Sequence, residues 1–165
     1  MKKSLILFFI LLISCANSGK ITDFDNYHFN NTEGIDFVIL HYEPNDKWVH
    51  ELLFKNEVPA DLSEVDLENI NKILQVAINH YNTDLKKSRE KDIDLSKYNR
   101  QYIAVLNENG EKEVYVNCFK NRQVRKDEHW KSDLYIVVDG GSDFFNIKIN
   151  LTKGFYYDFS VNGYA

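Results

Sequence analysis

The order of hydrophobic and polar positions divides the chain into four parts. An unbroken apolar run, Leu5–Ile13, is followed by a polar stretch, Asn17–Gly34. From Leu67 to Leu85, apolar residues recur at spacings of three and four, which is the period of a helix with one buried face. After Tyr98 the period changes to two, which is typical of strands with one face buried and the other in water. We therefore expect one helix followed by an antiparallel sheet.

The expected helix has a clear start signal. Ser63 is a favourable N-cap residue, and Asp66 three positions later gives a pattern similar to a capping box. Leu62 and Leu67 occupy the two positions of a hydrophobic staple. The expected apolar face consists of Leu67, Ile70, Leu74, Ala77, Ile78, Tyr81 and Leu85. These signals predict an amphipathic helix of about six turns.

Strands are indicated by β-branched and aromatic runs, by alternation and by turn residues. They are expected at 36–42, 102–106, 113–119, 134–138, 144–151 and 155–161. Asn109-Gly110 favours a type I′ hairpin turn. In the last strand Phe155, Tyr157, Phe159 and Val161 are expected on the core face. Trp48–Phe54 fits either a helical face or a strand, and a strand or irregular segment is favoured.

The fold class follows from burial. A helix with one apolar face and a sheet with one apolar face must cover each other. We therefore predict an α+β fold in which one amphipathic helix packs on a four- to six-stranded antiparallel meander, forming a single domain over 35–165. The order of elements is similar to that of cystatin-like and NTF2-like folds, which by itself implies no activity.

The N-terminus has the layout of a secretory signal. Two lysines precede the apolar run, which is too short for a bilayer span of about 20 residues. Leu12-Ile13-Ser14-Cys15 resembles the bacterial lipobox, which implies cleavage before Cys15 and lipidation of that residue. We expect 1–14 to be the signal peptide and 15–34 a lipidated tether. The alternative is an ordinary signal or a signal anchor with a chance cysteine. By the common sorting rule, Ala16 favours the outer membrane over the inner.

Charge and cysteine content exclude several classes of protein. A net charge of −5 argues against a general nucleic-acid binder, which needs a basic face. Two cysteines cannot form a multi-disulfide framework. Removal of the signal peptide would also remove Lys2 and Lys3 and make the chain more acidic. We therefore expect membrane contact to run through the lipid on Cys15 rather than through a basic patch.

Five histidines are candidate metal ligands, namely His28, His41, His50, His80 and His129. None stands in the H-x-x-x-H or H-E-x-x-H spacing that places two ligands on one helical face. His41, Glu43, His50 and Glu51 fall around one turn, but surface positions explain them more simply. We predict no metal site and no cofactor.

Three further features have a structural and a functional interpretation. Cys118 has no neighbouring base to lower its pKa, so we expect a small buried hydrophobic residue rather than a nucleophile. The carboxylates of Asp139 and Asp143 flank two glycines and could hold calcium, but a glycine turn is favoured. The basic loop Lys120–Lys131 could contact an acidic partner or phosphate, although a solvated loop is favoured because acidic residues interrupt it.

The chain from Pro59 to its end resembles an uncharacterised family of small bacterial secreted proteins and lipoproteins. The resemblance lies in Asp61-Leu62-Ser63, Tyr81-Asn82, Gln101-Tyr102, Gly110–Val114, Val116-Asn117-Cys118, Asp139-Gly140-Gly141 and Val161-Asn162-Gly163. This family carries no established activity, so the resemblance implies no catalytic residues.

The sequence favours a membrane-anchored, non-enzymatic module that binds an unknown envelope protein or ligand. Tyr115, Phe144 and Tyr156, which are expected on the exposed face of the meander, are candidate contact residues. One alternative is an enzyme or small-ligand binder that uses a pocket between helix and sheet. Another is a cystatin-like protease inhibitor, although Asn107–Lys112 does not supply the Q-x-V-x-G loop that cystatin-type inhibition uses.

Overall fold

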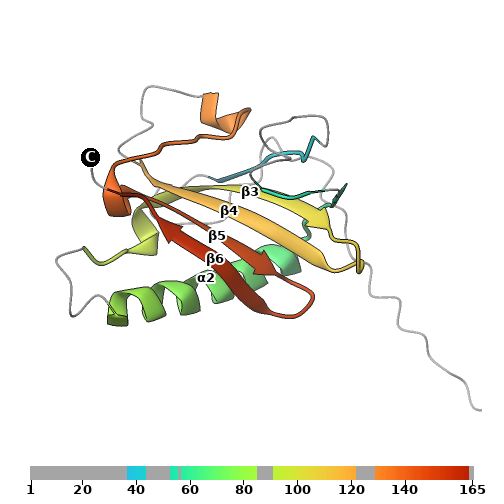
Figure 1. Cartoon of the computed structure of the whole chain (residues 1–165), viewed down its shortest axis with the longest axis horizontal. Coiled ribbons are helices and arrows are strands. Elements are labelled where there is room, and N and C mark those ends of the chain that lie inside the picture. Colours follow the sequence, from blue (N-terminus) through green and yellow to red (C-terminus); the bar gives the residue numbers. More distant parts are fainter. Residues whose placement is uncertain (1–36, 44–52, 56, 85–90, 122–128, 164–165) are drawn as a thin grey trace, which may run out of the picture.

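One long helix packs on one face of an open, mostly antiparallel sheet (Figure 1). The computed structural model describes residues 37–43, 53–55, 57–84, 91–121 and 129–163. The α+β class predicted from the sequence is confirmed. The predicted signal peptide and tether lie outside the described residues, as do residues 48–52 of the ambiguous segment. Among the described helices, none is both long and apolar enough to span a bilayer.

The elements follow one another in a simple order. The strands are β1 (Phe37–Ile39), β2 (Val58–Pro59), β3 (Tyr98–Leu106), β4 (Lys112–Lys120), β5 (Phe144–Asn150) and β6 (Phe155–Val161). The long helix is α2 (Glu64–Asp84), and the short 3₁₀ helices are η3 (Leu95–Lys97), η5 (His129–Lys131) and η6 (Gly141–Asp143). The sheet order is β1-β3-β4-β5-β6, and β2 also pairs with β3. The predicted meander is therefore β3 to β6, while β1 adds a short parallel pair with β3.

The predicted helix start is confirmed. The Asp66 carboxylate accepts hydrogen bonds from the Ser63 backbone N–H and hydroxyl, both at 2.9 Å, and the Ser63 hydroxyl accepts one from the Asp66 N–H at 3.2 Å. These bonds satisfy donors that a helix N-terminus otherwise leaves free. Lys112 on β4 binds the same carboxylate at 2.8 Å. The cap therefore also fixes the helix start against the sheet.

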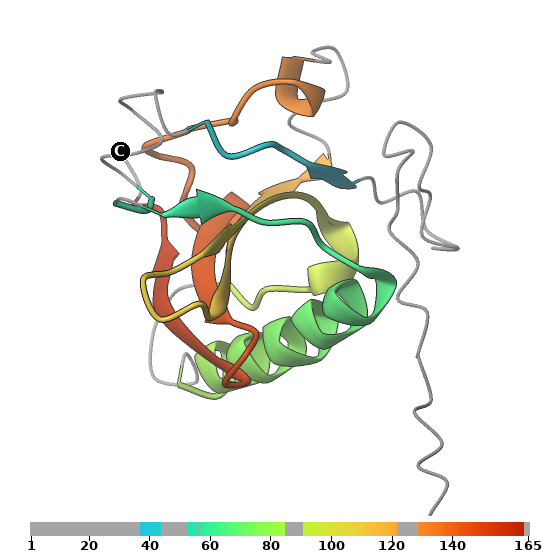
Figure 2. The same ribbon diagram turned by 90° about the vertical axis from the view of Figure 1, so that its right-hand side faces the viewer.

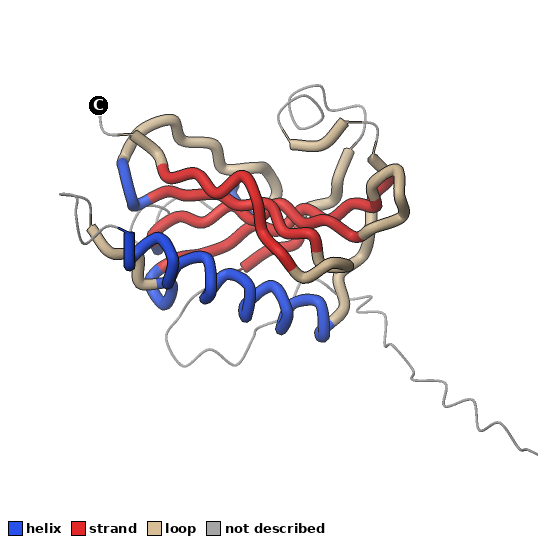
Figure 3. The backbone as a smooth tube through the Cα atoms, turned by 60° about the horizontal axis from the view of Figure 1, so that its bottom comes forward, coloured by secondary structure: helices blue, strands red, loops and turns tan. Residues whose placement is uncertain are grey.

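The main core lies between α2 and the inner face of the sheet. Figure 2 shows the sheet curving around the helix, and Figure 3 shows α2 along one side of the strands. The side chains that fill this space are Leu67, Ile70, Leu74 and Ile78 of the helix with Val114, Val116, Cys118, Phe145, Ile147 and Ile149 of the sheet. Each of these is at most 1% exposed. The predicted alternation along 113–119 and 144–151, which form β4 and β5, is thus confirmed.

The strand predicted at 134–138 is wrong. This segment is not paired in the sheet, because β4 and β5 pair directly with each other, for example at Val116 and Ile147. It runs instead over the face of the sheet opposite α2, as part of residues 129–139, which we call the strap. Side-chain amides rather than strand neighbours satisfy several of its backbone groups.

The hairpin between β3 and β4 differs from the predicted type I′ turn. That turn needs a positive φ at both central residues, but only Gly110 has one, at 72°. The loop is longer, since Asn107 N–H bonds Glu111 O at 3.0 Å and Gly110 N–H bonds Asn107 O at 2.8 Å. Gly110 remains the residue that allows the chain to reverse.

The side chains predicted on the core face of β6 are only partly correct, because the strand contains a β-bulge. Lys148 pairs with Tyr157 and Asn146 with Ser160, so two residues of β6 stand opposite one residue of β5. Asp158 within the bulge has a φ of 48°. The extra residue reverses the alternation, so Phe159 and Val161 pack on the core as predicted, whereas Tyr156 replaces Tyr157 there and Phe155 is 46% exposed.

Candidate functional site

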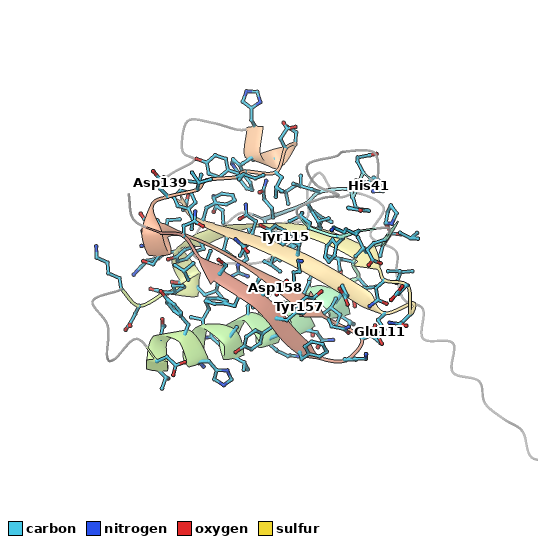
Figure 4. The ribbon with its side chains drawn as sticks, in the orientation of Figure 1. His41, Glu111, Tyr115, Asp139, Tyr157 and Asp158 are labelled. Carbon is cyan, nitrogen blue, oxygen red and sulfur yellow. The ribbon has the colours of Figure 1, made fainter. Side chains whose placement is uncertain are left out.

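The face of the sheet opposite α2, which we call the outer face, carries ordered rows of side chains. Register places Tyr115, Lys148 and Tyr157 side by side across β4, β5 and β6. The next row is Asn117, Asn146 and Ser160. Cross-strand neighbours of this kind lie close enough to act on one ligand. Figure 4 shows Tyr115 on β4 and Tyr157 and Asp158 on β6, on either side of β5.

Two chain segments cover parts of the outer face. At one side Leu53 and Phe54 pack with Tyr42 against residues of β3, and the Tyr42 hydroxyl donates to Phe54 O at 2.9 Å. At the other side the strap places Trp130 against Phe119, with ring centroids 5.4 Å apart. The covers are apolar and leave part of β4, β5 and β6 open between them.

Buried amides hold the strap on the sheet. Gln101 Nε2 donates to Trp130 O and Asp133 O at 2.5 and 2.8 Å, and its Oε1 accepts from Tyr135 N–H at 2.9 Å. Asn117 Nδ2 donates to Tyr135 O at 2.8 Å. Gln101 is fully buried, so these bonds replace water at groups that would otherwise be unsatisfied.

The open strip between the two covers is a cleft of about 490 Å³. Its floor comes from β4, β5 and β6, and its walls come from Leu53 and the strap. The lining residues are Leu53, Tyr115, Leu134, Ile136, Asn146, Lys148, Asp158, Phe159 and Ser160. This volume lies within the range of about 300–1,000 Å³ that is usual for small-molecule sites.

Lys148 is the cationic side chain of the cleft. Its Nζ lies 3.2 Å from Asp158 Oδ2, 5.5 Å from the centroid of the Phe54 ring and 5.9 Å from that of Tyr157. The Lys148 side chain is only 18% exposed, whereas that of Asp158 is 64% exposed. The two aromatic rings favour a cation at this position, but a largely exposed carboxylate is a weak counter-ion.

The tyrosines beside Lys148 remain protonated at neutral pH. Burial raises the pKa of Tyr115 above its ordinary value of 10.0, and nearby Cys118 adds to the shift. Burial also raises the pKa of Tyr157, together with the hydrogen bond that its hydroxyl donates to Glu113 Oε2. Both residues are therefore hydroxyl donors rather than phenolates.

Polar side chains in the cleft differ from those under the covers. Gln101 and Asn117 make hydrogen bonds to protein groups. Within the described ranges, no protein group makes a hydrogen bond to the side chains of Tyr115, Asn146 or Ser160. Polar groups of a folded protein usually bond to protein or water. These three side chains are thus available to a ligand.

The structure separates the three predicted contact residues. Tyr115 lines the cleft. Phe144 is only 9% exposed and lies beneath the strap, with its ring 6.2 Å from that of Tyr135. Tyr156 is on the helix side, where its hydroxyl lies 2.8 Å from His80 Nδ1. Sequence reasoning missed Asn146, Lys148, Asp158 and Ser160, although alternation with buried Phe145 and Ile147 already placed the first two outward.

The other sequence candidates do not form a site among the described residues. Cys118 is buried as predicted, and burial raises the pKa of its thiol to about 12. His41, His80 and His129 are exposed on separate elements, while His28 and His50 lie outside the described residues. Across the described ranges, no group of three His, Cys, Asp or Glu side chains is placed to hold a metal ion. Asp143 bonds Lys120 at 2.5 Å, and Gly140 and Gly141 have φ values of 89° and 57°, as a turn requires.

The space between helix and sheet gives no support to the alternative of a pocket there. The described side chains in this space are nearly all apolar and fully buried. The main polar exception is Arg100, whose guanidinium bonds Asn71 Oδ1 at 2.5 Å and Leu95 O at 3.4 Å. These contacts tie β3 to α2 and to η3.

Comparison of the chain with protein-family models, with curated proteins and with solved structures finds no match. The resemblance drawn from the sequence and the similarity to cystatin-like and NTF2-like folds therefore stay predictions.

Proposed function

We propose that this protein is a non-enzymatic binding module, tethered to the bacterial cell envelope, that holds a small ligand in the outer-face cleft. The observation that carries the proposal is the set of three side chains, from Tyr115, Asn146 and Ser160, that line the cleft without a protein partner among the described residues. A ligand with hydrogen-bonding groups gains most at polar groups that the fold itself leaves free.

The walls of the cleft suit a ligand with an apolar portion. Leu134 and Ile136 of the strap stand on one side, and Leu53 stands on the other. Ile136 is 57% exposed, so much of its aliphatic side chain is open to contact with a ligand. A ligand that covers these side chains removes apolar area from water, while the polar floor fixes its orientation.

A neutral probe tests this binding site. N-acetyl-leucinamide carries amide donors and acceptors and one aliphatic side chain. In NMR spectra of the purified, ¹⁵N-labelled full chain, we expect millimolar probe to shift the backbone amide signals of residues 115, 146 and 160 in a saturable manner. Asn146→Leu should weaken the binding, because it removes one of the free polar groups. Asn79→Leu, on the exposed side of α2, is the matched control and should leave it unchanged. Saturable shifts elsewhere in the chain, with none at the cleft, would contradict the proposal.

The tether part of the proposal rests on the pattern Leu12–Cys15. Two or more acyl chains anchor a protein stably, whereas one gives marginal binding. Expressed in a bacterium with its own signal, the chain should enter the detergent phase on Triton X-114 partition, and Cys15→Ser should move it to the aqueous phase or leave the signal uncleaved. Cys118→Ser changes the other cysteine and should partition like the unaltered chain. Equal partition of both variants with the unaltered chain, with the signal cleaved in all three, would refute lipidation at Cys15.

A further inference from the structure

The charged groups of the cleft define its ligand more closely than its shape does. Lys148 is the one cation among the lining residues, and its side chain is largely buried against Phe54 and Tyr157. A lysine ammonium has three N–H donors. Among the described residues, its hydrogen-bonding or ionic contact is with Asp158 alone, at 3.2 Å. Donors of this ammonium therefore remain for a ligand.

Asp158 is a counter-ion of Lys148 that a ligand anion can displace. Its side chain is 64% exposed and lies in the bulge of β6, where water competes for the carboxylate. Exposed ion pairs contribute little free energy. Lys148, by contrast, is held between two rings on the floor of the cleft. A ligand carboxylate can replace Asp158 at the ammonium while the lysine stays in position.

We infer that the cleft binds a small molecule with a single carboxylate, which accepts hydrogen bonds from Lys148; this inference rests on the proposed binding function. The hydroxyls of Tyr115 and Ser160 and the amide of Asn146 bind the polar remainder of the ligand, and the strap side chains contact its apolar part. The ligand is thus a hydroxy or amido acid with an aliphatic or aromatic portion.

Multiply charged anions do not fit this arrangement. Asp158 keeps a negative charge at the rim of the cleft, and the chain has a net charge of −5. No arginine and no helix N-terminus is among the residues that line the cleft, so the usual groups that recognise phosphate are missing from the described site. One lysine can balance one carboxylate, but not the double charge of a phosphate monoester or the charges of a polyanion.

A pair of probes that differ in one charge tests the inference. N-acetyl-leucine has the carboxylate, and N-acetyl-leucinamide has a neutral carboxamide of nearly the same shape. Titrated into the full chain at pH 7, the acid should bind at least about tenfold more tightly than the amide, because its hydrogen bond to Lys148 is charge-assisted. Lys148→Met should remove this difference, because the acid then loses the charged donor that distinguishes it from the amide. Lys153→Met is the matched control, since Lys153 is 55% exposed and pairs with Glu111 outside the cleft.

A second variant should have the opposite effect on the affinity for the acid. Asp158→Asn removes the competing carboxylate and keeps a residue type that tolerates a positive φ. It should tighten binding of the acid by about two- to fivefold and change the affinity of the neutral amide less, because the removed charge acts mainly on the ligand carboxylate. This variant also serves if Lys148→Met fails to fold.

The outcomes separate this inference from the proposed function. Equal affinities of acid and amide, with NMR shifts at residues 115, 146 and 160, would overturn the inferred preference for a carboxylate. The cleft would then still be a binding site. Weaker binding of the acid by Asp158→Asn would also overturn it. Absence of cleft shifts with either probe at millimolar concentration would overturn both.

Discussion

Two cations with mostly buried side chains lie on opposite faces of the sheet. Arg100, on the inner face, bonds the neutral oxygens of Asn71 and Leu95, so its role is to join β3 to the helical side of the fold. Lys148, on the outer face, lies in an open cleft beside an exposed carboxylate. The two cations therefore differ in their surroundings, since Arg100 is bonded within the core and Lys148 faces an open cleft. Neither setting could be predicted from the sequence, because the partners are distant along the chain.

Several buried acids make the stability of the fold sensitive to alkaline pH. Burial raises the pKa of Cys118 from 9.0 to about 12, and it raises the pKa of Tyr98, Tyr115 and Tyr157 above the ordinary 10.0. In the unfolded chain these groups titrate between about 8.5 and 10. Because the folded-state values are higher, the stabilisation is complete below this range and is lost as pH rises toward the folded-state values.

We therefore expect the Tm, followed by circular dichroism, to be steady between about pH 7 and 8.5 and to fall progressively above about pH 9. Cys118→Ala should lower the Tm at pH 7, because it leaves a small cavity in the core. The Tm of this variant should begin to fall at a pH about one unit higher than that of the unaltered protein, because only the tyrosines then titrate. A Tm that stays constant or rises through pH 10 would show that these groups do not control alkaline stability.

Local sequence signals made the helix predictable. The segments that were predicted wrongly are those whose structure depends on contacts between residues distant in the sequence. The signals for α2 lie within the segment itself, in the Ser63 cap and the apolar period. The strap at 134–138 has a strand-like composition, but its backbone partners are amides of Gln101, Asn117 and Asn162, which are far away in sequence. The bulge in β6 falls at an aspartate and has no distinctive sequence signal. The cleft depends on both the strap and the bulge, so its position could not be predicted from the pattern of residues.

Gln101 should be the side chain on which the strap depends most. Gln101→Met keeps the size of the side chain but leaves Trp130 O, Asp133 O and Tyr135 N–H without their partner. Because buried unsatisfied groups cost about 1–3 kcal/mol each and the strap can relax, we expect the free energy of unfolding to fall by about 2–4 kcal/mol. Hydrogen exchange should accelerate at residues 130–135 more than in β3, to which the strap is bound.

Gln75→Leu is the control for this prediction. Gln75 is an exposed glutamine of α2 whose side chain, among the described residues, bonds Asn79 alone, at 3.0 Å, so the change in stability should stay within about 0.5 kcal/mol. If Gln101→Met left exchange of the strap unchanged, apolar contacts of Trp130 rather than the amides would hold this segment.

Under the proposed function, the two faces of the sheet have different roles, since the inner face stabilises the fold and the outer face binds the ligand. The inner face and α2 are sealed by side chains such as Leu74 and Ile147, which are fully buried. The outer face keeps polar groups that the described protein does not satisfy, with Asn146 as the clearest case. Asn146 is only partly buried and is not a buried unsatisfied group, so water can hydrate it in the cleft and a ligand can replace that water.

This division predicts opposite effects for two substitutions. Leu74→Ala should lower the free energy of unfolding by about 2–5 kcal/mol, because it opens a cavity in the core, and should leave the affinity of the folded protein for N-acetyl-leucine unchanged. Asn146→Leu should change the free energy of unfolding by less than about 1 kcal/mol, because no described protein group bonds this side chain, while it weakens binding at the cleft. Urea unfolding and NMR titration of the same samples measure both quantities. If Asn146→Leu lowered the free energy of unfolding by more than about 1 kcal/mol, the Asn146 side chain would stabilise the fold. The outer face would then contribute to stability as the inner face does, and the division of roles between the two faces would be wrong.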